Sequence, residues 1–130
     1  MKTSTQSLLI ALVTTAAAMS AQAHHSFAMF DRSKKETISG TIRDFDWRNP
    51  HIYFWVFVPK TDGSEEVWGI EGGSPNLLMQ RGWSKTSFKP GEKVTLEIHP
   101  LKDGRPGGSF MKVTRADGTS MGEGGGAPAE

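Results

Sequence analysis

The chain of 130 residues contains no cysteine at all. It can therefore form neither a disulfide nor a thiolate metal site, so a bound metal must use imidazole, carboxylate, thioether or amine donors. Without disulfides the core must be held by packing alone. The four tryptophans and seven phenylalanines supply the apolar area that such a core needs.

The chain also lacks an excess of charge of either sign. It carries 15 lysines and arginines against 14 aspartates and glutamates. Proteins that bind nucleic acid through its phosphates carry a clustered basic surplus. We therefore expect no nucleic-acid partner.

Hydrophobic runs long enough to span a membrane are missing, and the longest apolar segment lies at the N-terminus. A short start with one cation, Lys2, precedes apolar residues 8–18, and the small residues Ala21 and Ala23 follow. This order is typical of a secretory signal peptide cleaved after Ala23. The alternative, a transmembrane anchor, needs about 20 apolar residues. We expect residues 1–23 to be a signal peptide, the mature protein to be periplasmic or secreted, and no membrane span to remain after cleavage.

Hydrophobic alternation indicates five strands and one short helix in the mature chain. The expected strands are residues 36–47, 51–58, 66–71, 93–99 and 109–114, and the expected helix is residues 75–81, capped by Ser74. A change of parity near Arg43–Asp44 predicts a bulge that bends the first strand. Both faces of residues 51–58 are apolar or aromatic, which predicts a central strand covered on both sides.

The order strand, strand, strand, helix, strand, strand is that of the OB-fold, a five-stranded Greek-key barrel. We therefore expect an all-β protein with one short helix, folded as a five-stranded OB-fold-like small barrel over residues 24–115. An open five-stranded sandwich with the same order of elements is the alternative. From Ala116 the sequence is rich in glycine, so residues 116–130 are predicted to be a disordered tail.

Short motifs spread over the expected domain carry a resemblance. They are His24-His25-Ser26-Phe27, Asn49-Pro50-His51, Glu71-Gly72-Gly73-Ser74-Pro75-Asn76, Arg81-Gly82-Trp83, Lys89-Pro90-Gly91 and Pro100-Leu101-Lys102-Asp103-Gly104. On these motifs the chain resembles an uncharacterised family of small exported bacterial proteins, filed only as a domain of unknown function. The resemblance implies export from the cytoplasm and assigns no activity, so the chemistry has to be argued from the residues.

Cleavage after Ala23 makes His24 the first residue, with an α-amine and an imidazole on one residue. The amine and Nδ1 of His24 can chelate a metal, and an imidazole from elsewhere then completes a histidine brace. Three nitrogens in a T shape suit Cu(II), which favours square-planar nitrogen and oxygen ligands and binds most tightly among the divalent metals. His51 is the preferred third ligand because it stands at a strand start after the turn at Pro50. The sequence therefore predicts a copper site used for metal handling.

His25 offers a second way to bind copper, through the amine, the intervening amide and its own imidazole. This mode needs no fold and no His51. Other groups are candidates around the site: Met29 as a thioether ligand for Cu(I) or as a core residue, and Asp31 or Asp46 as hydrogen-bond partners of an imidazole. Without a metal, the histidines are an ordinary chain terminus and a structural strand residue.

Aromatic residues gather in the first two expected strands, as Phe45, Trp47, Tyr53, Trp55 and Phe57. OB-folds bind oligonucleotides and sugars on the face of their second and third strands, where aromatic side chains stack on rings. Trp47, Tyr53 and Trp55 are therefore a candidate ligand face for a small ligand, a glycan or a protein partner. Core packing is the other explanation of the same residues.

No catalytic constellation stands out. Ser26 lies beside His25 in sequence only, and residues 72–75 lack the lysine and the spacing of a phosphate-binding loop. We therefore expect a binding protein rather than an enzyme, although a histidine brace also supports oxidative chemistry. A structural protein of the cell envelope without a discrete site is a third alternative.

Overall fold

The structure, a computed structural model, describes residues 28–123 and 125–127. Its elements are β1 (Glu36–Asp46), β2 (Tyr53–Pro59), β3 (Glu65–Glu71), α2 (Pro75–Met79), β4 (Lys93–Pro100), β5 (Gly107–Arg115), β6 (Ser120–Gly122) and β7 (Gly125–Ala127). Within these residues no helix is both long and apolar enough to span a membrane.

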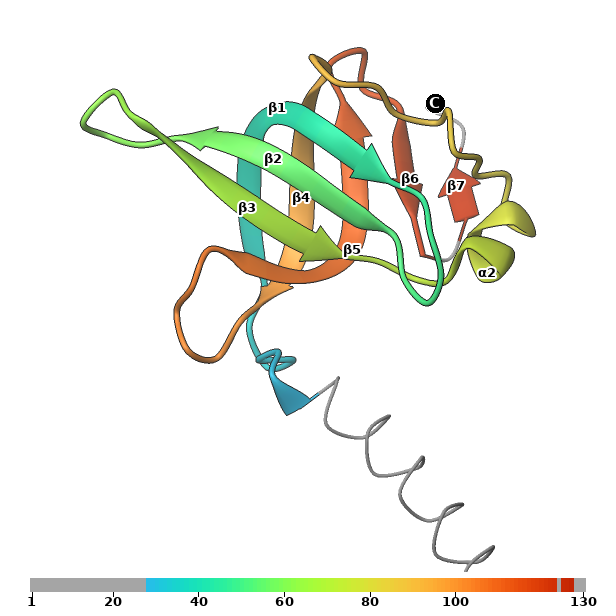
Figure 1. Ribbon diagram of the computed structural model, residues 1–130, viewed down its shortest axis with the longest axis horizontal. Coiled ribbons are helices and arrows are strands. Elements are labelled where there is room, and N and C mark those ends of the chain that lie inside the picture. Colours follow the sequence, from blue (N-terminus) through green and yellow to red (C-terminus); the bar gives the residue numbers. More distant parts are fainter. Residues whose placement is uncertain (1–27, 124, 128–130) are drawn as a thin grey trace, which may run out of the picture.

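Strands β1 to β5 close into a barrel (Figure 1). β1 pairs antiparallel with both β2 and β4, β2 pairs with β3, and β4 pairs with β5. A parallel pairing of β3 with β5 closes the ring, and α2 connects β3 to β4. This is the expected OB-fold-like barrel. The open sandwich is wrong, because its two sheets would not be joined by this last pairing.

β1 reaches two neighbours because it bends in its middle. Its residues 36–41 pair with β4, and its residues 41–46 pair with β2. The register shifts between Ile42 and Asp44, so the expected bulge is confirmed. Gly40 lies at the bend and has no space for a side chain, since a Cβ there would lie 2.2 Å from the carbonyl oxygen of Phe57.

The barrel interior is filled by aromatic and branched side chains. Phe54 is fully buried, and its ring centroid lies 4.9 to 6.2 Å from those of Phe45, Trp83, Phe88 and Phe110. Trp83 and Phe88 come from the connection after α2, so this connection belongs to the core. The cap of α2 is as expected, because the amide of Leu77 donates to the Ser74 hydroxyl at 3.3 Å.

The prediction that residues 51–58 are covered on both faces is wrong. On the inner face Ile52 and Phe54 are fully buried, whereas on the outer face Tyr53 and Trp55 are only half-buried. A closed barrel has a single interior, and α2 does not supply a second layer over the outside of β2 (Figure 1). The outer aromatic residues therefore stay accessible.

The prediction of a disordered tail from Ala116 is wrong for residues 116–123. β5 turns back as β6, which pairs with it in antiparallel register, and Met121 packs against the core. Gly118 makes the turn with a φ of 89°, and its amide donates to the carbonyl of Arg115. Composition misses this hairpin because tight turns and disordered tails use the same small polar residues.

Candidate functional site

A groove of about 230 Å³ lies on the outer face of β2 and β3. It is lined by Tyr53 and Trp55 of β2, Glu71 of β3, Met29 of the N-terminal segment and Arg105 of the loop between β4 and β5. The face of the second and third strands is also where OB-folds hold their ligands. The groove is therefore the first place to look for a site.

The N-terminal segment joins the barrel at this groove. Phe30 forms a β-bridge with Leu101, and the amide of Lys102 donates to the carbonyl of Met29 at 2.9 Å. Phe30 is buried, but Met29 is 41% exposed and lines the groove. Core filling, one of the two roles considered for Met29, is therefore wrong. His24 and His25 lie outside the described residues.

Tyr53 and Trp55 form an aromatic platform beside the groove. Their rings are stacked, with centroids 5.6 Å apart and an angle of 14° between the planes. The Arg43 guanidinium lies 5.5 Å from the Trp55 ring centroid, a cation–π contact. Gly69 on β3 leaves room for the indole, because a Cβ there would lie 2.6 Å from Cζ3 of Trp55. The platform is thus ordered by its neighbours while remaining half-exposed.

The structure separates Trp47 from the other two members of the predicted ligand face. Trp47 packs against the core, with its ring centroid 5.8 Å from that of Phe45. The bulge in β1 explains the separation, because the shifted register puts Phe45 and Trp47 on the inner side of the barrel. Of the predicted face, only Tyr53 and Trp55 lie together on the outside.

Next to the platform, polar side chains form a chain of contacts. The Tyr53 hydroxyl donates to Oε2 of Glu71 at 2.9 Å, and Oε1 of Glu71 lies 3.6 Å from Nε2 of His51. Nδ1 of His51 lies 3.1 Å from the carbonyl oxygen of Gly72. Because a carbonyl oxygen only accepts, this contact requires the proton on Nδ1 and leaves Nε2 as the nitrogen that faces the carboxylate.

Glu71 is the site residue that sequence reasoning missed. Asp31 and Asp46 are the predicted partners of an imidazole, but Asp31 pairs with Lys34 at 3.5 Å and Asp46 pairs with Arg48. Glu71 reaches the site because the β2–β3 register places it directly opposite Tyr53. Its only signal in the sequence is its position at the end of the third expected strand, beside two glycines.

The described part of the chain brings together a pair of metal-binding side chains rather than a trio. Across residues 28–123 and 125–127, no group of three histidine, aspartate or glutamate side chains could hold a metal ion. His99 lies on another strand, where its Nδ1 contacts the carbonyl of Lys34 at 2.7 Å. A metal at His51 and Glu71 would therefore need further donors, such as those of residues 24 and 25.

The surroundings of Tyr53 raise the pKa of its hydroxyl to about 12. Partial burial is the largest cause, followed by the hydrogen bond to Glu71 and the negative charge of that carboxylate. All three disfavour the phenolate. Tyr53 is the only tyrosine of the chain, so its ionisation can be followed without overlap.

We expect the ultraviolet absorbance of the phenolate to appear near pH 12 in the folded protein, against about pH 10 for an exposed tyrosine. Glu71→Gln should lower this pKa only in part, because burial persists. Since folding raises the pKa, the stabilisation is fully present below about pH 10 and is lost as the pH rises toward 12. Glu66→Gln is the control, because Glu66 accepts from Trp68 instead. An ordinary Tyr53 pKa in the native protein would contradict the contact with Glu71.

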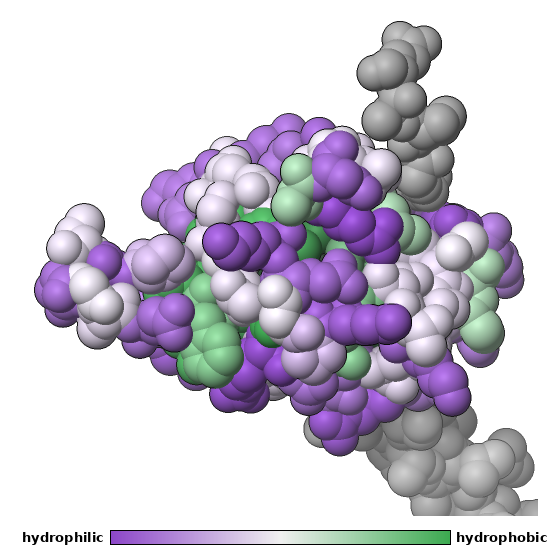
Figure 2. All heavy atoms as spheres, turned by 90° about the horizontal axis from the view of Figure 1, so that it is seen from above, coloured by the Kyte–Doolittle hydropathy of each residue, from purple (hydrophilic) through white to green (hydrophobic). Residues whose placement is uncertain are grey.

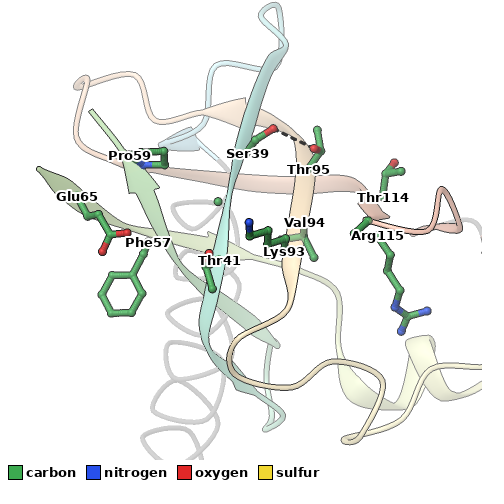
Figure 3. Close-up of a pocket in the computed structure, with 12 residues that line it drawn as sticks. Ser39, Thr41, Phe57, Pro59, Glu65, Lys93, Val94, Thr95, Thr114 and Arg115 are labelled. Atoms are coloured by element: carbon green, nitrogen blue, oxygen red, sulfur yellow. Dashed lines mark hydrogen bonds between the residues drawn. The ribbon is translucent and has the colours of Figure 1, made fainter. Parts of the chain in front are cut away.

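A larger groove lies elsewhere, across β1 and β4, with a volume of about 390 Å³. Figure 3 shows its side chains spread over several strands rather than converging on one point. The hydroxyls of Ser39 and Thr95 form a hydrogen bond, with their oxygens 2.9 Å apart. The guanidinium carbon of Arg115 lies 4.4 Å from the ring centroid of Phe88. This groove offers no organised set of polar groups.

The surface of the protein is mainly hydrophilic when it is seen from above. Its apolar atoms gather beside the projecting β2–β3 hairpin (Figure 2).

Comparison with known proteins yields a family and no activity. No curated protein and no solved structure matches the chain. A family match covers residues 11–110, which include part of the predicted signal peptide and almost the whole barrel. Because this match spans most of its length, the chain belongs to DUF6152, a family of unknown function.

Proposed function

We propose that the mature protein is an exported, periplasmic or secreted copper-binding protein that holds Cu(II) between His24 and His51 and serves metal handling. One observation carries the proposal. The N-terminal segment joins the barrel at the groove lined by Glu71, and the Glu71 carboxylate faces Nε2 of His51 at 3.6 Å. Met29, five residues after His24, thus lines the same groove as Glu71, the residue that contacts His51.

The length of the connecting segment allows His24 to reach His51. Met29 and Glu71 line the same groove, and Glu71 contacts His51. An extended chain covers about 3.3–3.6 Å per residue, so His24 can extend up to about 17 Å from Met29. The proposal therefore needs His51 to lie within about 17 Å of Met29.

His51 is oriented as metal-binding histidines are. Such histidines donate one ring N–H to a carbonyl or carboxylate, which fixes the ring and its tautomer, and bind the metal through the other nitrogen. Here Nδ1 contacts the carbonyl of Gly72, so Nε2 is the nitrogen that would meet the metal. The α-amine of His24 would supply a second nitrogen, because its pKa of about 7.7–8.0 allows a metal to displace the proton near neutral pH.

The test compares the mature protein beginning at His24 with a version carrying one extra alanine before it. Titration with Cu(II), followed by electron paramagnetic resonance, should show nitrogen-rich binding to the first protein. The extra alanine should weaken binding by roughly 100-fold or more, since even hydrogen-bond partners of metal ligands are worth about 10–100-fold. His51→Ala should also weaken binding, while His99→Ala, on another strand, should not.

Two outcomes would contradict the brace. If His51→Ala leaves the affinity unchanged and His25→Ala abolishes binding, copper is held by the peptide-like mode of residues 24–25. If the mature protein does not bind Cu(II) at all, copper binding is wrong.

A metal-free binding module is the second candidate, favoured by the stacked and half-exposed pair Tyr53 and Trp55 beside the groove. Flat aromatic faces stack on sugar rings and other planar ligands. Binding of such a ligand needs Trp55 but needs neither His24 nor a free N-terminus. The extra alanine, which should weaken copper binding, should therefore leave the binding of a planar ligand unchanged.

A further inference from the structure

We propose that the groove on the outer face of β2 and β3 binds a small organic cation, an ammonium group carried on a flat or apolar body. The Glu71 carboxylate receives the ammonium group, and the rings of Tyr53 and Trp55 contact the body of the ligand. The inference rests on the second candidate function, the metal-free binding module, and gives the chemistry of its ligand. It uses described residues only and requires no copper.

The shape of the groove favours a small ligand. Its volume of about 230 Å³ is below the roughly 300–1,000 Å³ of pockets for drug-sized ligands. Part of its lining is main chain without side chains, because Gly69 of β3 and Gly108 of β5 lie there. The Trp55 indole lies against Gly69, where a Cβ would be 2.6 Å from Cζ3. The bare main chain therefore gives the indole its place beside the groove.

The Glu71 carboxylate has no permanently charged partner. Its side chain is only 14% exposed, and within residues 28–123 and 125–127 it forms no ion pair with a lysine or an arginine. His51 lies 3.6 Å from it, but an imidazole is charged only when it is protonated. A largely buried carboxylate is costly unless a positive charge compensates it. An ammonium group in the groove would supply that charge.

The aromatic rings beside Glu71 also suit a cation. The face of an aromatic ring attracts an ammonium or guanidinium group within about 6 Å of its centroid. Trp55 already makes such a contact, with the guanidinium carbon of Arg43 5.5 Å from its centroid, but Arg43 does not line the groove. Tyr53 stands opposite Glu71 in the paired strands and donates its hydroxyl to Oε2. A cation at this carboxylate therefore also lies close to the Tyr53 side chain.

Arg105 is the cationic residue that lines the groove, and it lies away from Glu71. Gly69 of β3 pairs with Gly107 of β5 in parallel register. Glu71 follows this pair and Arg105 precedes it, so the two charges lie toward opposite ends of the groove. Arg105 is exposed, and its Nε donates to the carboxylate of Asp103 at 2.7 Å. Its charge is thus matched by Asp103, and the end of the groove at Glu71 keeps its negative charge.

The experiment is isothermal titration calorimetry of the metal-free mature protein with phenethylamine, 2-phenylethanol and 3-phenylpropionate. The probes share a phenyl ring and differ in charge near neutral pH, being positive, neutral and negative in that order. Phenethylamine should bind at least about tenfold more tightly than 2-phenylethanol, because hydrogen bonds to charged groups are the stronger ones. 3-Phenylpropionate should bind most weakly, because its carboxylate would meet that of Glu71.

Glu71→Gln is the variant that tests the role of the charge, because glutamine keeps the size of the side chain. It should weaken phenethylamine binding by about tenfold, to the level of 2-phenylethanol. Its affinity for 2-phenylethanol should stay unchanged, which shows that the groove is intact. Glu66→Gln on the same strand is the matched control, since Glu66 accepts from Trp68 and does not line the groove. This control should keep the preference for phenethylamine.

Two results would overturn the inference, and they have different consequences. If the native protein binds the three probes equally, or if Glu71→Gln keeps the preference for phenethylamine, the groove does not recognise a cation and the binding module still stands. If the native protein binds none of the probes, the inference and the binding module both fail. Neither result bears on copper binding, which has its own test.

Discussion

Gly40→Ala is expected to destabilise the fold by about 3 kcal/mol, a loss of more than roughly 100-fold in the ratio of folded to unfolded protein. A Cβ at this position would lie 2.2 Å from the carbonyl oxygen of Phe57 and 2.8 Å from Cγ1 of Val56. The first contact is with main chain of β2, which is paired on both sides and cannot move away. The β1–β2 pairing must therefore open at the bend that lets β1 serve both of its neighbours.

The measurement is the urea midpoint of unfolding, compared with that of Ser39→Ala. Ser39 is exposed on the same strand, so its substitution should stay within about 0.5 kcal/mol of the native protein. A Gly40→Ala protein as stable as Ser39→Ala would show that the bend tolerates a side chain.

Phe54→Ala is expected to destabilise the barrel by about 3–5 kcal/mol, the usual range for a large aromatic residue in a core. Phe54 is fully buried, and four aromatic rings surround it. Truncation removes apolar burial and also leaves a cavity that these rings cannot fill by themselves. Because small domains have a net stability of only about 5–15 kcal/mol, a large part of the stability would be lost.

Phe57→Ala is the matched control for Phe54→Ala, because both residues are phenylalanines of β2. Phe57 lies on the outer face and is only partly buried, so its truncation should destabilise the protein less. Thermal unfolding followed by circular dichroism gives both values. Equal losses would contradict the division of β2 into an inner and an outer face.

Local patterns predicted the fold well because the relevant interactions are local. The parity change near Arg43 indicated the bulge, and Ser74 followed by Pro75 indicated the helix start; both are observed. The exposure of the outer face of β2 was harder to predict. Its aromatic residues are compatible with a buried or an exposed position, because alternation alone does not tell how many layers cover a sheet.

The arrangement of the candidate site could be predicted only in part. The sequence named His51 for its place at a strand start, and Tyr53 and Trp55 for their aromatic character. Trp47 was grouped with them because a bulge changes which residues share a face, and the consequence of the bulge for Trp47 depends on the partner strand. Glu71 was not found, because it meets Tyr53 and His51 only through the pairing of β2 with β3.

The sequence by itself determined the order of strands and helix along the chain, excluded cysteine as a metal ligand, and set which histidines are available for a metal. These follow from composition and from short-range periodicity, which act along the chain. Tertiary structure alone decided that β3 closes on β5, that the N-terminal segment joins the barrel beside β2, and that Glu71 faces His51. Such contacts depend on register and closure, and these are set by the simultaneous packing of strands far apart in the sequence.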